Sequence, residues 1–360
     1  MKSPANLIFF VTSKCACHCH FCFYRDQVRR HDPEKELTLA EIEDFARSYG
    51  SLRSLSISGG EPFLRSDLEQ ILDIFATCCR PRVIDIPTSG IDPARVENVL
   101  AAFCKSHPET IVNFQLSVDG PPAVHDKVRG VAGLYAQARE TSRRVSLLSG
   151  RFPNLRQAIV TVFGHHNRTS VGEFYGMVEK NFQFNRLILT PEVKGTSIFP
   201  LSLEEEYREW RSAASALNRR AASNGISVFY DCVSRAHDGF RREINRRRLL
   251  GRFCGAGNKM LVLDQEGEIY PCEPLWFSFG NIRDYGYRVE KVLKSARARD
   301  FAAGRSSCHC DWSCAQVNAL VGNPRLWPGI LPAAAGELFR IIRAAGFPRK
   351  RVKNSRLKQA

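Results

Sequence analysis

The sequence has 360 residues, of which 44% are hydrophobic and 25% charged. These values are ordinary for a globular chain, and they argue against a fibre, wholesale disorder or an integral membrane protein. Two features are unusual, a formal net charge of +15 and a total of 13 cysteines. At roughly 150 residues per domain, the length predicts two to three domains.

No apolar run approaches the ~18 residues needed to span a bilayer. The apolar run Leu7–Val11 is also shorter than the core of a signal peptide. We therefore expect a cytoplasmic protein. In that reducing compartment, clustered cysteines are more often metal ligands or catalytic groups than disulfides.

The first two hundred residues alternate short apolar runs with helical patterns. The apolar runs predict six strands, at Leu7–Thr12, Leu52–Ser58, Val83–Pro87, Ile111–Val118, Leu155–Phe163 and Phe184–Thr190. Helical spacing predicts helices between them, with capping pairs Thr38/Glu41, Ser66/Glu69 and Ser170/Glu173 at three of the starts. Six such units predict an α/β fold, a partial (β/α)6 barrel with a parallel sheet.

Polar and glycine-rich segments follow the first four predicted strands. They begin at Cys15, Gly59, Thr88 and Asp119. Because the carboxyl ends of parallel strands meet at one rim of a barrel, we expect these segments to lie together.

The pattern changes after Pro200. We predict a core barrel over residues 1–200 and a helical connector with an Arg-rich segment over 201–250. A small Cys-rich domain over 251–320 and a basic amphipathic tail over 321–360 would follow.

Four cysteines lie within eight residues at the end of the first predicted strand. Cys15, Cys19 and Cys22 have the spacing C-x3-C-x2-C. Thiolates suit iron–sulfur clusters and zinc, and for zinc Cys17, His18 or His20 could complete a tetrahedron. Three cysteines on a cluster of four irons would instead leave one iron open to another ligand.

The combination of C-x3-C-x2-C after the first strand with Gly59-Gly60-Glu61-Pro62 after the second resembles the radical S-adenosylmethionine (SAM) superfamily. The resemblance covers roughly residues 5–190, and it includes the aromatic Phe21 before the last cysteine. It implies that Cys15, Cys19 and Cys22 hold a 4Fe–4S cluster whose fourth iron is chelated by SAM.

The same resemblance implies further contacts to SAM. Gly59 and Gly60 would let backbone approach the ligand, and Glu61 would accept a hydrogen bond from its ammonium group. The other predicted contacts are Phe21 at the adenine, Ser89, Ser117 and Asp119 at the ribose or carboxylate, and Arg129 at the carboxylate. Turn hydrogen bonding is the alternative for Ser89 and Ser117, and a solvated surface charge is the alternative for Arg129. Cys17 is interpreted as a bystander.

A second cysteine group resembles the SPASM or twitch region of radical SAM enzymes. Cys254 and the pair Gly267/Cys272 match its first half, and Cys308-His309-Cys310 with Cys314 is a shortened second half. The count favours one auxiliary 4Fe–4S cluster, held by Cys254, Cys272, Cys314 and either Cys308 or Cys310, with Cys310 preferred. A zinc ribbon is the structural alternative.

The positive charge is concentrated in two segments. Arg235–Arg252 contains seven arginines, and Arg340–Lys358 contains eight Lys and Arg residues without an acid. The tail could lie on an anionic membrane surface, or it could be a short packed helix with a solvated end. No RNA-recognition pattern is present, so we expect no nucleic-acid partner.

The leading hypothesis is a radical SAM oxidoreductase or maturase that cleaves SAM and abstracts a hydrogen from a peptide or small molecule. An external electron donor of the flavodoxin or ferredoxin type would reduce the first cluster, and the auxiliary cluster would assist a net oxidation. Because the first predicted strand begins close to Met1, we expect no N-terminal peptide-recognition domain ahead of it, although a separate chain could supply one. The alternatives are a lipid or membrane-associated substrate and a non-enzymatic zinc or iron–sulfur protein.

Overall fold

The computed structural model describes residues 3–192, 200–221, 237, 254–304, 312, 314 and 317. Within these residues, nine strands form one sheet in the order β6-β5-β4-β3-β2-β1-β7-β8-β9. The strands are β1 (Asn6–Thr12), β2 (Ser54–Gly59), β3 (Val83–Thr88), β4 (Ile111–Ser117), β5 (Leu155–Phe163), β6 (Arg186–Pro191), β7 (Met260–Leu263), β8 (Glu268–Tyr270) and β9 (Gly280–Asn281). Strands β1 to β6 pair in parallel, as predicted.

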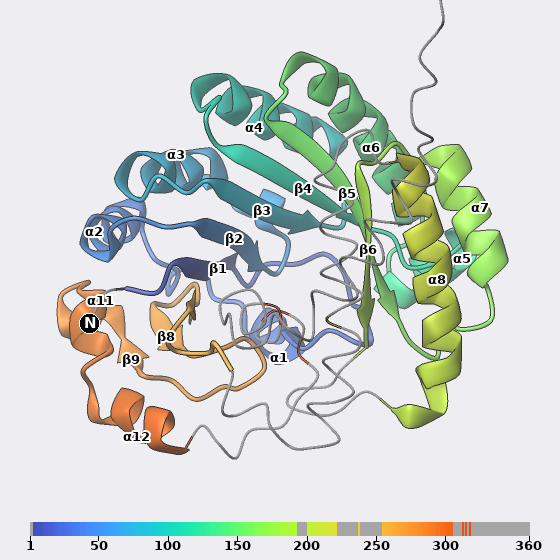
Figure 1. The fold of residues 1–360 in the computed structure, drawn as a ribbon. Coiled ribbons are helices and arrows are strands. Elements are labelled where there is room, and N and C mark those ends of the chain that lie inside the picture. Colours follow the sequence, from blue (N-terminus) through green and yellow to red (C-terminus); the bar gives the residue numbers. More distant parts are fainter. Residues whose placement is uncertain are drawn as a thin grey trace, which may run out of the picture.

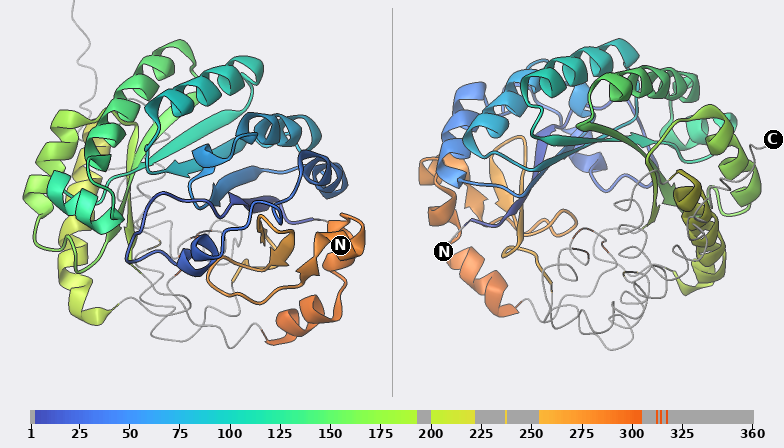
Figure 2. Two further views of the ribbon diagram at one scale, coloured as in Figure 1. Left: turned by 180° about the vertical axis from the view of Figure 1, so that it is seen from behind. Right: turned by 45° about the horizontal axis from the view of Figure 1, so that its top comes forward.

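Helices cover the outer, convex face of the sheet (Figures 1 and 2). The longer helices are α2 (Leu39–Tyr49), α3 (Leu68–Cys78), α4 (Pro93–Ser106), α5 (Pro122–Arg129), α6 (Leu134–Arg151), α7 (Val171–Asn181), α8 (Glu204–Ala221) and α12 (Ala296–Gly304). Shorter turns are α1 (Arg25–Arg29), α11 (Val289–Val292) and the 3-10 turns η1 (Pro62–Leu64), η2 (Leu201–Leu203) and η3 (Ile282–Tyr285).

Strand alternation separates an apolar outer face from a polar inner one. In β2, Leu55 and Ile57 are fully buried in the same core cluster as Phe45 of α2 and Phe75 of α3. The intervening serines are only half-buried. Since successive side chains point to opposite faces of a strand, the serines face the hollow side of the sheet. The fold therefore places its polar side chains on the concave surface.

Of the three helix caps predicted from the sequence, one is confirmed and two are wrong. Thr38 and Glu41 form the predicted capping box at α2. The predicted caps at Ser66 and Ser170 are wrong. Helix α3 begins after Asp67 without a side-chain cap, since Arg65 binds that carboxylate at 2.5 Å. Ser170 precedes α7, but its hydroxyl donates to the Asn167 carbonyl instead.

The Cys-rich region extends the barrel sheet, a pairing that the sequence did not indicate. Strand β7 is fully buried and pairs in parallel with β1, with Leu7 opposite Leu261. Strands β8 and β9 follow as antiparallel neighbours. On the outside, Arg283 donates to Glu41 at 2.6 Å, and this contact holds the pKa of Glu41 at about 2. One carboxylate thus caps α2 and anchors the Cys-rich region.

Two predicted segments lie outside the described residues. These are the Arg-rich segment Arg235–Arg252, of which only residue 237 is described, and the basic tail over 321–360. Helix α8, from the predicted connector, packs against β6 and α7, and its Trp210 is fully buried. Among the described helices, none combines the length and apolar character that crossing a membrane requires.

The turn between β7 and β8 contains a buried acid whose ionisation opposes folding. Burial raises the pKa of Asp264 to about 7 from 3.8, although it accepts bonds from the amides of Glu266 and Glu268. The protonated form therefore stabilises the fold below about pH 4, and this contribution is lost as the pH rises through about 7. Asp264→Asn removes the ionisation and keeps an acceptor oxygen.

We expect the difference in unfolding free energy, Asp264→Asn minus wild type, to increase as the pH rises from about 4 to 7. The slope should approach about 1.4 kcal/mol per pH unit and flatten above that range. Urea unfolding across this pH range measures the difference. Asp284→Asn, an exposed change nearby, is the control. Parallel curves for wild type and Asp264→Asn would contradict the expectation.

Candidate active site

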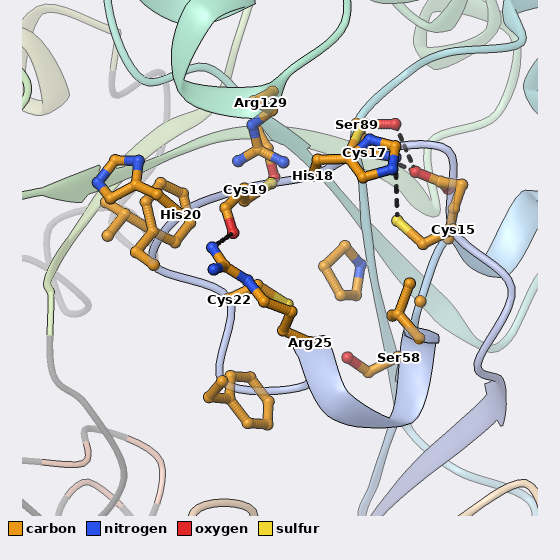
Figure 3. Close-up of a pocket in the computed structure, with 18 of the residues that line it drawn as sticks. Cys15, Cys17, His18, Cys19, His20, Cys22, Arg25, Ser58, Ser89 and Arg129 are labelled. Atoms are coloured by element: carbon orange, nitrogen blue, oxygen red, sulfur yellow. Dashed lines mark hydrogen bonds between the residues drawn. The ribbon is translucent and has the colours of Figure 1, made fainter. Parts of the chain in front are cut away.

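A cavity of about 770 Å³ lies at the carboxyl ends of the barrel strands. The loop after β1 and helix α1 form one wall, and the ends of β2 to β6, Arg129 and Trp312 complete the lining (Figure 3). Its lining includes ten of the residues predicted from the sequence, namely Cys15, Cys19, Phe21, Cys22, Gly59, Gly60, Glu61, Ser89, Ser117 and Arg129. The shared rim expected for parallel strands therefore brings these residues together.

The four cysteines of the first loop lie close to one another. The Cys17 amide donates to the Cys15 sulfur at 3.4 Å, and the Cys17 thiol hydrogen-bonds with both Cys15 and Cys19. Arg25 of α1 donates to the Cys19 carbonyl at 2.6 Å, which fixes the far side of the loop. Cys17 thus lies among the other cysteine thiols of this loop. Its role as a bystander or a metal ligand stays a prediction.

Raised pKa values keep the thiols of Cys17, Cys19 and Cys22 protonated when no metal is bound. Hydrogen bonding to Cys15 and burial raise the pKa of Cys17 to about 11. A hydrogen bond with Cys17 and burial raise the pKa of Cys19, and burial raises that of Cys22. Thiolate ligands form when a metal displaces such protons. A set of converging thiols in an apolar loop fits an iron–sulfur cluster.

Two glycines at the end of β2 allow the cysteine loop to approach. A Cβ on Gly59 would lie 2.4 Å from the Thr12 carbonyl oxygen, and one on Gly60 would lie 2.2 Å from that of Lys14. Gly59 also has a φ of +119°, which disfavours residues with side chains. The Gly60 amide donates to the Thr12 carbonyl at 2.8 Å. The pair therefore joins the ends of β1 and β2.

Glu61 is buried and spans the ends of β2 and β3. Its carboxylate accepts from the Thr88 hydroxyl at 2.6 Å and from the Ser89 hydroxyl and amide at 2.6 and 2.8 Å. These bonds use most of its acceptor capacity. Glu61 thus holds the β3 loop in place. Its predicted contact with the SAM ammonium stays a prediction. Ser89 donates to Glu61 from the neighbouring strand end rather than within a turn, and its contact with SAM also stays a prediction.

Arg129 is buried beneath the cysteine loop rather than solvated. Both Nε and Nη2 bind the Asp119 carboxylate at 2.8 Å, and the guanidinium lies 5.9 Å from the Phe21 ring centroid. Burial alone would raise the pKa of Asp119, but the Arg129 charge holds it below its usual range. Asp119 itself does not line the cavity. It acts on the site through Arg129, a role that the sequence prediction missed.

Part of the second cysteine group lies against the first. Cys254 and Cys272 are buried in an apolar cluster with Ile8 and Phe10 of β1, and Cys22 packs against that cluster. The Glu273 carboxylate accepts from Trp312 Nε1 at 2.7 Å and from the Cys314 thiol. Trp312 also lines the cavity. Cys308 and Cys310 lie outside the described residues.

Several residues in or beside the cavity were not assigned to the SAM site from the sequence. Thr88 orients Glu61, and His20, His166 and Glu192 gather at one side of the site. His166 and Glu192 follow the ends of β5 and β6. The rule that located the loops after the first four strands would have found them if it had been applied to the last two.

Family comparisons match both parts of the chain. Residues 9–168 match the model of the radical SAM superfamily, and residues 254–315 match the SPASM model, described as an iron-sulfur cluster-binding domain. The matched segments contain both cysteine groups.

Curated relatives are distant. The chain is 25% identical to the antilisterial bacteriocin subtilosin biosynthesis protein AlbA of Bacillus subtilis, over 85% of this chain and 64% of AlbA. It is 23% identical to the mycofactocin maturase MftC of Mycolicibacterium smegmatis, over 90% of this chain and 81% of MftC. A probable GTP 3',8-cyclase of Thermococcus kodakarensis is 30% identical over 41% of this chain and 46% of that protein. The chain thus spans less than two thirds of two of these relatives.

Solved structures share the fold. A polyhistidine-tagged form of anSMEcpe with bound AdoMet has a TM-score of 0.59 at 17% identity, covering 95% of this chain and 99% of that one. Streptococcus suis SuiB bound to S-adenosylmethionine has a TM-score of 0.52 at 16% identity, covering 75% and 60%.

The partial barrel with a cysteine loop at its rim defines a radical SAM protein. The chain belongs to the radical SAM superfamily, and it carries a SPASM domain beside the barrel. Its cofactors are accordingly SAM, a 4Fe–4S cluster and a further iron–sulfur cluster. The SPASM match favours iron–sulfur over the zinc ribbon for the second cysteine group.

The Asp119–Arg129 pair predicts a large effect for a nearly isosteric change. Asp119→Asn leaves a buried guanidinium without its counter-charge, so we expect a loss of about 3–5 kcal/mol in unfolding free energy. Chemical unfolding of the reconstituted protein measures it. Glu140→Gln, which breaks an exposed pair with Arg143, should change stability little. Equal effects of the two substitutions would show that burial of the pair is unimportant.

Proposed function

We propose that this protein is a radical SAM maturase that oxidises a peptide substrate, with the SPASM cluster accepting electrons from the substrate. The observation that supports this most is the position of the cavity. Its wall includes the cysteine loop and Trp312, whose indole binds Glu273 next to Cys272. The cavity therefore borders the first cysteine group directly and reaches the second through Trp312 and Glu273, which supports a reaction that uses both clusters.

The proposed ligand sets are those that the sequence predicts. We assign Cys15, Cys19 and Cys22 to the SAM-binding cluster, and Cys254, Cys272, Cys314 and Cys310 to the auxiliary cluster. When bound, the first cluster and SAM supply an electron and a carbon radical that removes a substrate hydrogen. An external flavodoxin or ferredoxin type of donor provides the electron for that step.

The protein's own residues position SAM and exclude water. Gly59 and Gly60 leave room for close backbone approach, and Phe21 offers an aromatic face to the adenine. Arg129 presents a fixed positive charge to the SAM carboxylate, because Asp119 locks its orientation. Ser89 and Ser117 supply hydroxyls at the ends of β3 and β4.

A peptide is favoured over a free small molecule for two reasons. A cavity of about 770 Å³ is at the upper end of the range for a drug-sized ligand, so it can hold SAM and a substrate side chain together. AlbA is named for bacteriocin biosynthesis and MftC as a maturase. The likeness to the SuiB and anSMEcpe structures supports the fold only and not the choice of substrate.

Cluster content and SAM cleavage test the two ligand sets. Anaerobic reconstitution should yield about eight irons per chain, and dithionite with SAM should give 5′-deoxyadenosine. Cys15→Ala should abolish deoxyadenosine formation. Cys272→Ala should lose about four irons and keep SAM cleavage. Cys104→Ala, a buried cysteine of α4 that packs in the core, is the matched control and should keep both properties.

Bound zinc without deoxyadenosine in the wild type would contradict the enzyme assignment. For the substrate, the probes are synthetic peptides encoded by small reading frames beside the gene. We expect one of them to lose a pair of hydrogens by mass spectrometry, in wild type but not in Cys272→Ala. Oxidation that is equal in both proteins would contradict the electron-accepting role of the auxiliary cluster.

A further inference from the structure

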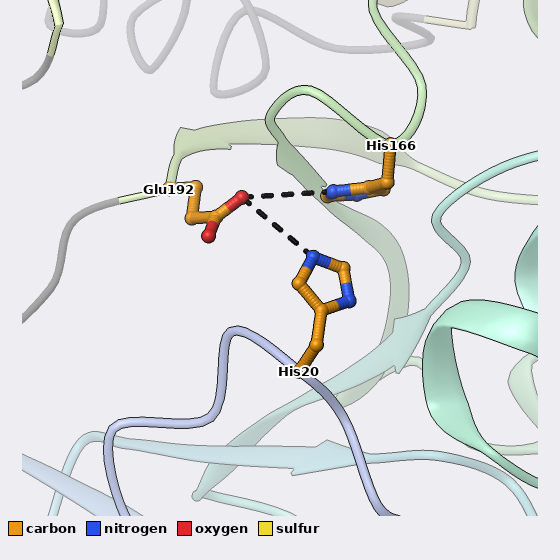
Figure 4. A group of neighbouring side chains, drawn as sticks. All are labelled: His20, His166 and Glu192. Atoms are coloured by element: carbon orange, nitrogen blue, oxygen red, sulfur yellow. Dashed lines mark ion pairs between the residues drawn. The ribbon is translucent and has the colours of Figure 1, made fainter.

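Two histidines and a glutamate converge next to the cysteine loop (Figure 4). His20 comes from the cysteine loop, His166 from the loop after β5, and Glu192 from the end of β6. Each offers one ligand atom, and the three atoms lie within 4.8 Å of one another. His20 and Glu192 also line the cavity. The cluster therefore borders the active site but uses none of the predicted iron–sulfur ligands.

The hydrogen bond of His166 fixes which ring nitrogen is available. Its Nε2 lies 3.0 Å from the Val162 carbonyl oxygen, and a carbonyl only accepts, so Nε2 must carry the proton. In the neutral ring, Nδ1 is then a bare lone pair. Nδ1 is buried without a hydrogen-bond partner, and the side chain as a whole is 8% exposed.

This lone pair points at a second hydrogen-bond acceptor, the Glu192 carboxylate. Nδ1 lies 3.6 Å from Glu192 Oε2, which is too long for a direct hydrogen bond. His20 Nε2 lies 3.9 Å from the same oxygen. A buried acceptor facing a carboxylate is unfavourable unless a proton or a metal cation lies between them.

The spacing suits a metal ion. Donors bound at about 2.1 Å in a tetrahedral site lie about 3.4 Å apart. The two distances to Glu192 Oε2 exceed this by a few tenths of an ångström, and the two histidine nitrogens, which lie within 4.8 Å of each other, would approach by at most about 1.4 Å on binding an ion. The His166 Nε2 bond to a backbone carbonyl matches the way that metal-ligating histidines are usually oriented.

Gly164 leaves the space that this arrangement needs. A Cβ there would lie 2.1 Å from Glu192 Oε2 and 3.1 Å from the His166 ring. A side chain at this position would therefore displace the carboxylate from the histidine.

We propose that His20, His166 and Glu192 form a binding site for a divalent transition metal ion of the zinc or iron(II) type, distinct from both clusters. Two imidazoles and one carboxylate are donors that suit such ions. Three protein ligands leave at least one position open, and the cavity adjoins it. The ion thus binds a donor atom of the substrate and orients the substrate beside the cysteine loop.

Cobalt(II) is the probe for this site. The fully reconstituted holoprotein, with its iron content measured before and after, is titrated anaerobically with Co²⁺. High-spin Co²⁺ is followed by electron paramagnetic resonance, because oxidised 4Fe–4S clusters are diamagnetic. Zinc competition and metal analysis after desalting give the stoichiometry. The variants are His166→Gln and Glu192→Gln, and His165→Gln, an exposed neighbour on the same loop, is the matched control.

We expect one Co²⁺ per chain in the wild type and in His165→Gln, displaced by zinc, with unchanged iron. His166→Gln and Glu192→Gln should each bind Co²⁺ at least tenfold more weakly while retaining their iron. Iron retention separates loss of this site from misfolding. Equal Co²⁺ binding in all four proteins, or no stoichiometric binding to the wild type, would overturn the proposal.

Discussion

Strand β1 is paired in parallel along both of its edges, and both cysteine groups depend on that pairing. On one edge lies β2, whose terminal Gly59 and Gly60 meet the backbone of Thr12 and Lys14 and so direct the cysteine loop into the rim. On the other edge lies β7, between Cys254 and Cys272. Ile8 and Phe10 of β1 share an apolar cluster with both of these cysteines. A single buried strand therefore sets the distance between the two sites.

The positive charge of Arg129 beside the site is likewise fixed in place by a few buried contacts. Arg129 has a carboxylate partner on one side and the thiols of the cysteine loop on the other, which brings a permanent positive charge close to groups that become anionic when they bind metal. Because Asp119 is itself bound by the Val162 amide at 2.9 Å, the pair cannot rotate freely. Electrostatics at the rim are thus determined by residues that lie behind the cavity wall.

The periodic parts of the chain were predictable, and the long-range contacts were not. Apolar alternation located all six barrel strands, and the rim rule gathered ten of the predicted residues around one cavity. Capping pairs failed at Ser66 because α3 begins after Asp67, whose carboxylate binds Arg65, and at Ser170 because its hydroxyl donates to the Asn167 carbonyl. The β1–β7 pairing depends on residues more than two hundred and fifty positions apart, and no local pattern records it. Glu61 and Asp119 were singled out from the sequence, but their hydrogen-bond partners, Thr88, Ser89 and Arg129, required the fold.

The shared strand also has a consequence for the order in which the protein matures. Strand β7 lies beyond the whole barrel in the sequence, so the site containing Cys254 and Cys272 forms only when a late segment docks on the earliest strand. The Arg283–Glu41 bond closes the same late contact from outside. During synthesis the first cysteine loop is therefore exposed long before its neighbour arrives. Cluster delivery must either follow completion of the sheet or protect that loop while the sheet is still open.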